Sequence, residues 1–252
     1  MKNGKNTGNE VMPTATATPA RVRMFQPSQR PQERRETITT AWGTIKIEGR
    51  IGQRHADLLD ATLYTALKSR KISDGGIELL VDPAAVRRLM SAKQYSYEQI
   101  KRLYVDLENV RIELKTQKMH VLGGIIDHVV LSEATRSNPL NGEKRRLWRV
   151  RLNIAFVQLI ENDIKLYYNP APVAALKNGV SQAVARHILS HRQEPQGGWR
   201  LDTLIAAVAG DLNDAQMRDK RREIRADTAT LAQIDIHIEG DKIGRASCRE
   251  RV

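Results

Sequence analysis

One arrangement of glycines, short strands and helices occurs twice in this chain, and it constrains the fold more than any other feature. Residues 75–83 and 197–203 each begin with a glycine pair, continue with a short strand-like stretch and reach an aspartate, Asp82 or Asp202. The glycines predict a turn, and each aspartate predicts the N-cap of a helix. In the first copy Pro83 takes the first helical position, where its missing N–H costs nothing.

The sequence around each copy extends the repeat. A helical stretch precedes each copy, and a longer basic helix and a hairpin follow it. Helix, strand, short helix, long helix and hairpin is the order of a winged helix-turn-helix. The sequence therefore predicts an α+β fold class with two tandem winged-helix (wHTH) domains. The predicted leading helices are 53–69 and 171–191, the long helices are 96–115 and 213–233, and the hairpins are 119–130 and 234–241.

The domain boundaries follow from this repeat. The first winged-helix domain is expected over residues 37–160, with an additional hairpin at 37–50 and a strand at 146–159, where apolar and polar residues alternate. The second domain is expected over residues 161–241, with a strand at 164–168.

Both ends of the chain are predicted to lie outside the two domains. Residues 1–36 are polar, proline-containing and basic without apolar periodicity, which is typical of a disordered basic arm. Residues 242–252 resemble a translated sequencing adapter and carry the single cysteine, Cys248. Excluding such a scar from the fold leaves the second domain truncated at Asp241, within its hairpin.

The charge of the chain indicates the chemistry of its partner. The 252 residues include 41 Lys and Arg against 29 Asp and Glu, a formal net charge of +12. Such an excess favours a polyanion, with nucleic acid first. There is no apolar run long enough to span a membrane, no signal peptide, and too few cysteines for a disulfide. We therefore expect a cytoplasmic bacterial protein with no membrane partner, no cofactor and no metal.

Double-stranded DNA is the expected partner, and the two long helices are expected to bind it. The second helix of a helix-turn-helix enters the major groove, where Arg and Lys can bind guanine and Asn and Gln can bind adenine. The second long helix is richer in cations, so the second domain is expected to provide the main DNA recognition. The first would contact the DNA backbone, with a wing turn at Gly123 and Gly124. The predicted DNA-binding residues are Gln94, Ser96, Tyr97, Gln99, Lys101 and Arg102 in the first domain, and Asn213, Gln216, Arg218, Lys220, Arg221, Arg222 and Arg225 in the second.

Motifs for catalysis are weak, and no enzymatic activity is predicted. The chain has no G-x-x-x-x-G-K-[ST] phosphate loop. Tyr167 and Tyr168 could be the paired nucleophiles of a rolling-circle nickase, but no His-x-His motif accompanies them, so core packing is favoured. His187 and His191 have a spacing that can bind zinc. No third ligand is evident, so a pair near the helix C-terminus is favoured.

The second half resembles a known family of DNA-binding proteins. The helix at 180–189, the strand, turn and helix after it, and the stretch 217–224 are similar to the C-terminal winged helix of TrfA-type, iteron-binding plasmid replication initiator proteins. The resemblance covers about residues 37–241 and is weaker in the first half. Asp219 departs from it, because a cation is expected there.

This resemblance carries implications that composition and spacing do not. It implies binding to repeated origin sites (iterons), opening of an adjacent AT-rich region, and recruitment of the host helicase and the host initiator protein. It also implies a monomer–homodimer equilibrium with the first domain as the dimerisation face. The alternative is a DNA-binding transcriptional repressor or partition regulator, because both functions need only a scaffold that binds a DNA groove.

Overall fold

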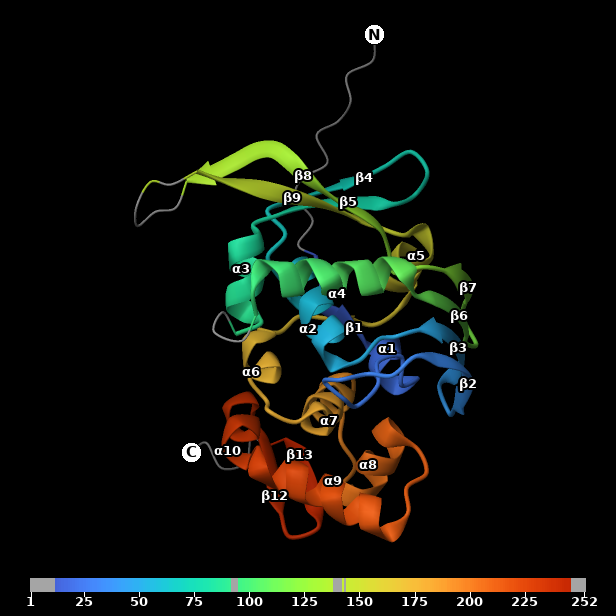
Figure 1. Ribbon diagram of the computed structural model, residues 1–252. Helices are drawn as coiled ribbons and strands as arrows, with labels where there is room; N and C mark the ends of the chain where they lie inside the picture. The colour runs from blue at the N-terminus through green and yellow to red at the C-terminus, as the bar shows by residue number, and fades with distance from the viewer. Residues whose placement is uncertain (1–11, 92–94, 138–141, 143, 246–252) are drawn as a thin grey trace.

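The computed structural model describes residues 12–91, 95–137, 142 and 144–245 (Figure 1). The described residues form an α+β protein with two separate apolar cores. One core gathers buried residues between Val22 and Ile160, and the other gathers buried residues between Val173 and Ile243. The two cores correspond to the two halves of the repeat.

The first half contains the expected order of elements. The N-cap at Asp82 is confirmed, because its Oδ1 accepts a hydrogen bond from the Ala84 N–H at 2.9 Å and Pro83 starts the helix. β5 pairs with β9, and β9 pairs with β8, all antiparallel. The bounds are α2 (Gln53–Tyr64), β4 (Lys68–Lys71), β5 (Ile77–Val81), α3 (Pro83–Leu89), α4 (Tyr97–Asn109), β8 (Ile126–Ser137) and β9 (Lys144–Leu152).

A second four-stranded sheet belongs to the same half and corrects two predictions. The hairpin expected at 37–50 is confirmed, and it pairs with two further strands in the order β2 (Arg34–Thr40), β3 (Gly43–Gly49), β6 (Arg111–Lys115) and β7 (His120–Gly123). The long helix therefore ends at Asn109, not near 115, because Ile112 and Leu114 alternate into the core of a sheet. Gly123 ends β7, which pairs with β6, whereas β8 pairs with β9, so the hairpin expected at 119–130 and its wing turn at Gly123 and Gly124 are wrong.

The segment after β9 also differs from the prediction. The strand expected at 146–159 ends at Leu152, and α5 (Ile154–Asn162) follows it. Asn153 starts this helix, since its side chain accepts a hydrogen bond from the Ala155 N–H at 2.9 Å. The strand expected at 164–168 is present as β10 (Lys165–Leu166).

The N-terminal segment is ordered from residue 12 onward, so the predicted disorder of 1–36 is wrong for that part. β1 (Ala15–Thr16) pairs with β10, and α1 (Ala17–Arg21) packs against α7 and α8 of the other half. Thr14 donates its hydroxyl to the Tyr168 carbonyl at 2.8 Å. The buried side chains of this segment, such as Thr16 and Ala17, are small, so the backbone can fit between the two halves. Residues 1–11 lie outside the described residues.

The second half repeats the order of the first. The leading helix expected at 171–191 is divided into two helices, and just before the second one the Asp227 carboxylate accepts the N–H groups of Lys177 and Asn178 at 3.1 and 3.0 Å. Arg200, not Asp202, is the N-cap of the short helix, and the long helix ends at Ala226. The bounds are α6 (Ala171–Ala174), α7 (Gly179–Leu189), β11 (Trp199–Arg200), α8 (Leu201–Ala209), α9 (Asp214–Ala226), α10 (Thr228–Leu231), the 3-10 helix η1 (Ala232–Ile234) and β12 (Ile236–Glu239).

The last described strand corrects the prediction that residues 242–252 lie outside the fold. β13 (Lys242–Arg245) is the middle strand of a three-stranded sheet in the order β11, β13, β12. Ile243 is 1% exposed and belongs to the second apolar core. The hairpin therefore closes across Gly240 and is not truncated at Asp241. Residues 246–252 lie outside the described residues.

Candidate nucleic-acid interface

The helix α9 is the most exposed of the predicted DNA-binding elements. Ile224 is the one fully buried side chain of this helix, and the other side chains of α9 are partly buried or exposed. Asn213 and Gln216 form a capping box: the Gln216 N–H donates to Asn213 Oδ1 at 2.9 Å, and the Asn213 N–H donates to Gln216 Oε1 at 3.0 Å. Both predicted base-contacting amides therefore hold the helix start in this structure.

The cations of α9 divide into paired and unpaired groups. Arg221 binds both oxygens of Asp202 on α8 at 2.5 Å, and this bidentate pair joins α8 and α9. The hydrogen bonds from Arg221 lower the pKa of Asp202. Arg222 lies beside Asp219 at 2.9 Å with 80% of its side chain exposed. Among the described residues Arg218 has no ion-pair partner, and it is exposed.

Two further cations of α9 make local contacts. Lys220 lies 2.9 Å from Glu223 in the same helix. Arg225 donates to the Gly240 carbonyl at 2.9 Å, which connects α9 to the turn between β12 and β13. The exposed positive surface of α9 therefore includes Arg218, which has no ion-pair partner among the described residues, and Arg222, whose pair with Asp219 lies in solvent.

The helix α4 differs from α9 in charge. It carries the cations Lys101 and Arg102 against three acids, whereas α9 carries five cations against three acids. Lys101 lies 2.7 Å from Glu98, and Arg102 is exposed without an ion-pair partner among the described residues. A net acidic helix is a poor match for DNA phosphates.

The other predicted residues of the first half lie at the start of α4. Ser96 and Gln99 form a capping box, with the Ser96 N–H donating to Gln99 Oε1 at 2.7 Å. Tyr97 is 38% exposed, and the Arg87 guanidinium stacks 5.3 Å from its ring centre. Gln94 lies outside the described residues.

The hairpin of β8 and β9 is a basic surface that the sequence prediction missed. In Figure 1 it extends from its sheet past α3. β9 contains five cations and no acid. Arg145 is paired with Asp82 at 3.2 Å, whereas Lys144 and Arg146 are exposed and have no ion-pair partner among the described residues. The basic run at 144–146 is the sequence signal for this surface, whereas the glycine pair at 123–124 predicts a wing turn at a different place.

The motifs considered for catalysis differ in their surroundings. Tyr168 is partly buried and its hydroxyl donates to Asp60 at 2.9 Å, whereas Tyr167 is 62% exposed, so the core packing expected of Tyr167 is wrong. His187 and His191 stack with ring centres 4.8 Å apart. Among the described residues, no three His, Cys, Asp or Glu side chains are placed to hold a metal ion. The described helices include none with the length and apolarity needed to cross a bilayer.

Comparison with known proteins supports the fold. No protein-family model matches the chain, and no curated protein matches it. Two solved structures resemble it across both halves. The crystal structure of selenomethionine derivatives of domains 2 and 3 of RctB has a TM-score of 0.54 at 12% identity, covering 91% of this chain and 95% of that one. A second crystal structure of RctB domains 2–3 has a TM-score of 0.53 at 11% identity, covering 88% and 84%.

Proposed function

We propose that this chain is a sequence-specific double-stranded DNA-binding protein that acts as a replication initiator at repeated origin sites. In this proposal it binds plasmid iterons, promotes opening of the neighbouring AT-rich region, and recruits the host helicase and the host initiator. It works in the bacterial cytoplasm, in a monomer–homodimer equilibrium, without a cofactor and without catalysis of its own.

The observation that supports this proposal best is the repetition of one topology in the two halves. Each half places a helix, a strand, two helices and a hairpin in the same order, and the strand pairs with the second strand of the hairpin. We interpret each half as a winged helix. The likeness to the crystal structures of RctB domains 2 and 3 extends over both halves.

The exposed cations give each half a different task in this proposal. α9 enters the major groove, with Arg218 and Arg222 available for base edges or phosphates, since Arg binds both in a bidentate manner. Arg221 holds α9 against α8 through Asp202. In the first half, Lys144 and Arg146 of the β9 strand contact phosphates, and α4 contributes less than the sequence predicts.

A plasmid test separates initiation from regulation. A minimal plasmid that carries the candidate repeats should replicate only when this gene is expressed, and the purified protein should bind those repeats. Binding without support of replication would favour the transcriptional repressor or partition regulator instead. A protein that binds no DNA at low salt would contradict both functions, because phosphate contacts are strongest there.

A further inference from the structure

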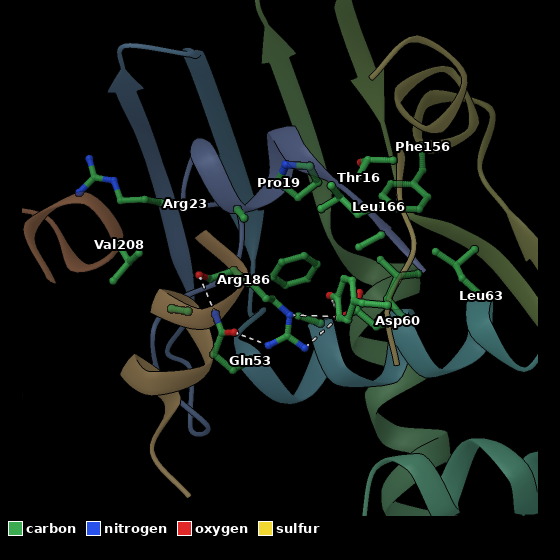
Figure 2. Close-up of a pocket in the computed structure, with 17 residues that line it drawn as sticks. Thr16, Pro19, Arg23, Gln53, Asp60, Leu63, Phe156, Leu166, Arg186 and Val208 are labelled. Carbon is green, nitrogen blue, oxygen red and sulfur yellow. Dashed lines mark hydrogen bonds and ion pairs between the residues drawn. The ribbon is translucent and has the colours of Figure 1, made fainter. Parts of the chain in front are cut away.

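A group of buried polar side chains joins the two halves of the molecule. Arg186 of α7 extends away from the core of the second half and reaches one face of α2 (Figure 2). Its guanidinium donates to Gln53 Oε1 at 2.8 Å, to Asp57 Oδ1 at 2.6 Å, and to Asp60 Oδ2 at 3.0 and 3.1 Å. The three acceptors are spaced four and three residues apart, so they lie on one face of α2.

Two more side chains complete this group. Gln182 of α7 donates to Asp57 Oδ2 at 2.9 Å, and Tyr168 donates to Asp60. We call these residues the Arg186 cluster: Gln53, Asp57, Asp60, Tyr168, Gln182 and Arg186. Its two carboxylates and its guanidinium are each less than a tenth exposed. Burial raises the pKa of both aspartates, although Arg186 partly opposes this rise.

The Arg186 cluster is poorly explained by a gain in stability. Desolvation of a buried ion pair usually offsets its attraction, and apolar residues of similar volume often stabilise a protein as well or better. A planar guanidinium instead makes directional hydrogen bonds, because its N–H groups point at fixed angles. The apolar packing nearby constrains the orientation of the two halves less. A cavity of about 40 Å³ lies beside Asp60, between side chains of both halves such as Leu59 and Val208.

The cluster is connected to both candidate DNA-binding helices. α2 packs against α4, and the hydroxyls of Thr62 and Tyr104 lie 2.6 Å apart between them. α7 packs against α9, and the Asn178 amide donates to the Glu223 carbonyl at 2.9 Å. A continuous series of contacts therefore runs from α4 through α2, the Arg186 cluster and α7 to α9.

We propose that Arg186 is a positioning residue that fixes the orientation of the two halves and thereby sets which spacing of two DNA subsites the protein accepts. The part about spacing rests on the proposed function, whereas the part about orientation does not. DNA turns once in about 10.5 base pairs, so subsites moved by about half a turn face opposite sides of the duplex. Two rigidly oriented domains cannot bind both of them at once.

The orientation is tested without DNA. Spin labels on Gln117→Cys, in the turn between β6 and β7, and Ala229→Cys, in α10, report the distance between the halves once Cys248→Ser removes the native thiol. The parent should give one narrow distance distribution. The triple variant Arg186→Met, Asp57→Asn and Asp60→Asn removes the charges together and should broaden it.

A second variant protects the test against misfolding. Arg186→Lys keeps the charge but loses the planar donors, and it should also broaden the distance distribution. If the triple variant does not fold, Arg186→Lys alone tests whether Arg186 fixes the orientation of the two halves. A control, Lys71→Met, breaks the ion pair with Glu161 at 2.6 Å inside the first half and should change nothing. A distribution as narrow as that of the parent in every folded cluster variant would overturn the proposal.

The spacing is tested with duplexes that contain both subsites. For the parent, moving one subsite by about half a helical turn should weaken binding about a hundredfold, because simultaneous engagement is lost. For the folded cluster variants the loss should fall below about tenfold. Equal spacing selectivity in parent and variants would overturn the DNA part. A parent that binds no duplex would contradict the proposed function and leave the result on orientation standing.

Discussion

The buried histidine His187 gives the chain a pH-dependent stability that can be measured. Its side chain is packed on α7 beside His191 and Arg21, and its Nδ1 has no hydrogen-bond partner in the described part of the protein. Burial, together with the charges of His191 and Arg21, lowers the pKa of His187 to about 4, although a hydrogen bond with the Ala20 backbone opposes this change.

The sign of the effect follows from the two states. In the unfolded chain a histidine has a pKa of about 6.5, so it binds a proton well before the folded His187 does. The unfolded state therefore gains protons first as the pH falls from about 6.5 to about 4, and the free energy of unfolding decreases through that window. The full difference in pKa corresponds to about 3 kcal/mol, of which about 2 kcal/mol is lost between pH 7 and pH 5.

The assay compares urea unfolding of the parent and of His187→Gln at about pH 7 and about pH 5. The parent should lose about 2 kcal/mol more than the variant between these values. The raised pKa values of Asp57 and Asp60 act in the opposite direction, but both proteins contain them, so the comparison removes their contribution. His128→Gln, which replaces an exposed histidine, is the matched control. Equal losses in the parent and in His187→Gln would refute the reasoning.

Three further outcomes test the second core and the proposed interface. Ile224→Ala removes the fully buried side chain of α9 and should lower the free energy of unfolding by about 2–5 kcal/mol in chemical denaturation. Arg222→Ala should weaken DNA binding and reduce the slope of log affinity against log salt by about one, if Arg222 contacts a phosphate as proposed. Replacing Lys144 and Arg146 together by Ala should weaken binding about equally for all DNA sequences while unfolding stays unchanged, because both side chains are exposed and unpaired among the described residues.

Local signals in the sequence predicted the parts of the fold that depend on local chemistry. Asp82 with Pro83 starts a helix as expected, and the two long helices begin beside Ser96 and Asn213 as expected, because a capping side chain acts within three residues of itself. The repeated order of elements was also predictable, because turns, strands and helices each leave a pattern within a few neighbouring residues.

Features that depend on distant partners were missed. The N-terminal segment has the composition of a solvated arm, yet Thr14 and Arg21 find partners more than a hundred residues away, at Tyr168 and Ser190. Arg186 is separated from Asp60 by 126 positions, so no local pattern in the sequence connects the two residues. The true β8–β9 hairpin was overlooked because its register shifts between Leu131 and Thr135, which interrupts the alternation expected of a strand.

The distribution of charge distinguishes the two halves more sharply than their common topology does. A duplicated unit would be expected to carry its charge on the same element twice, but in the first half α4 has two cations against three acids and β9 has five cations and no acid, whereas in the second half α9 has five cations against three acids. Phosphate contacts position a protein, and base contacts specify the sequence. Under the proposed function, the first half therefore provides affinity and register, while α9 provides most of the choice of sequence. Such a division works only if the two halves keep a fixed relation, and the Arg186 cluster is the buried polar connection between α2 and α7 that could maintain it.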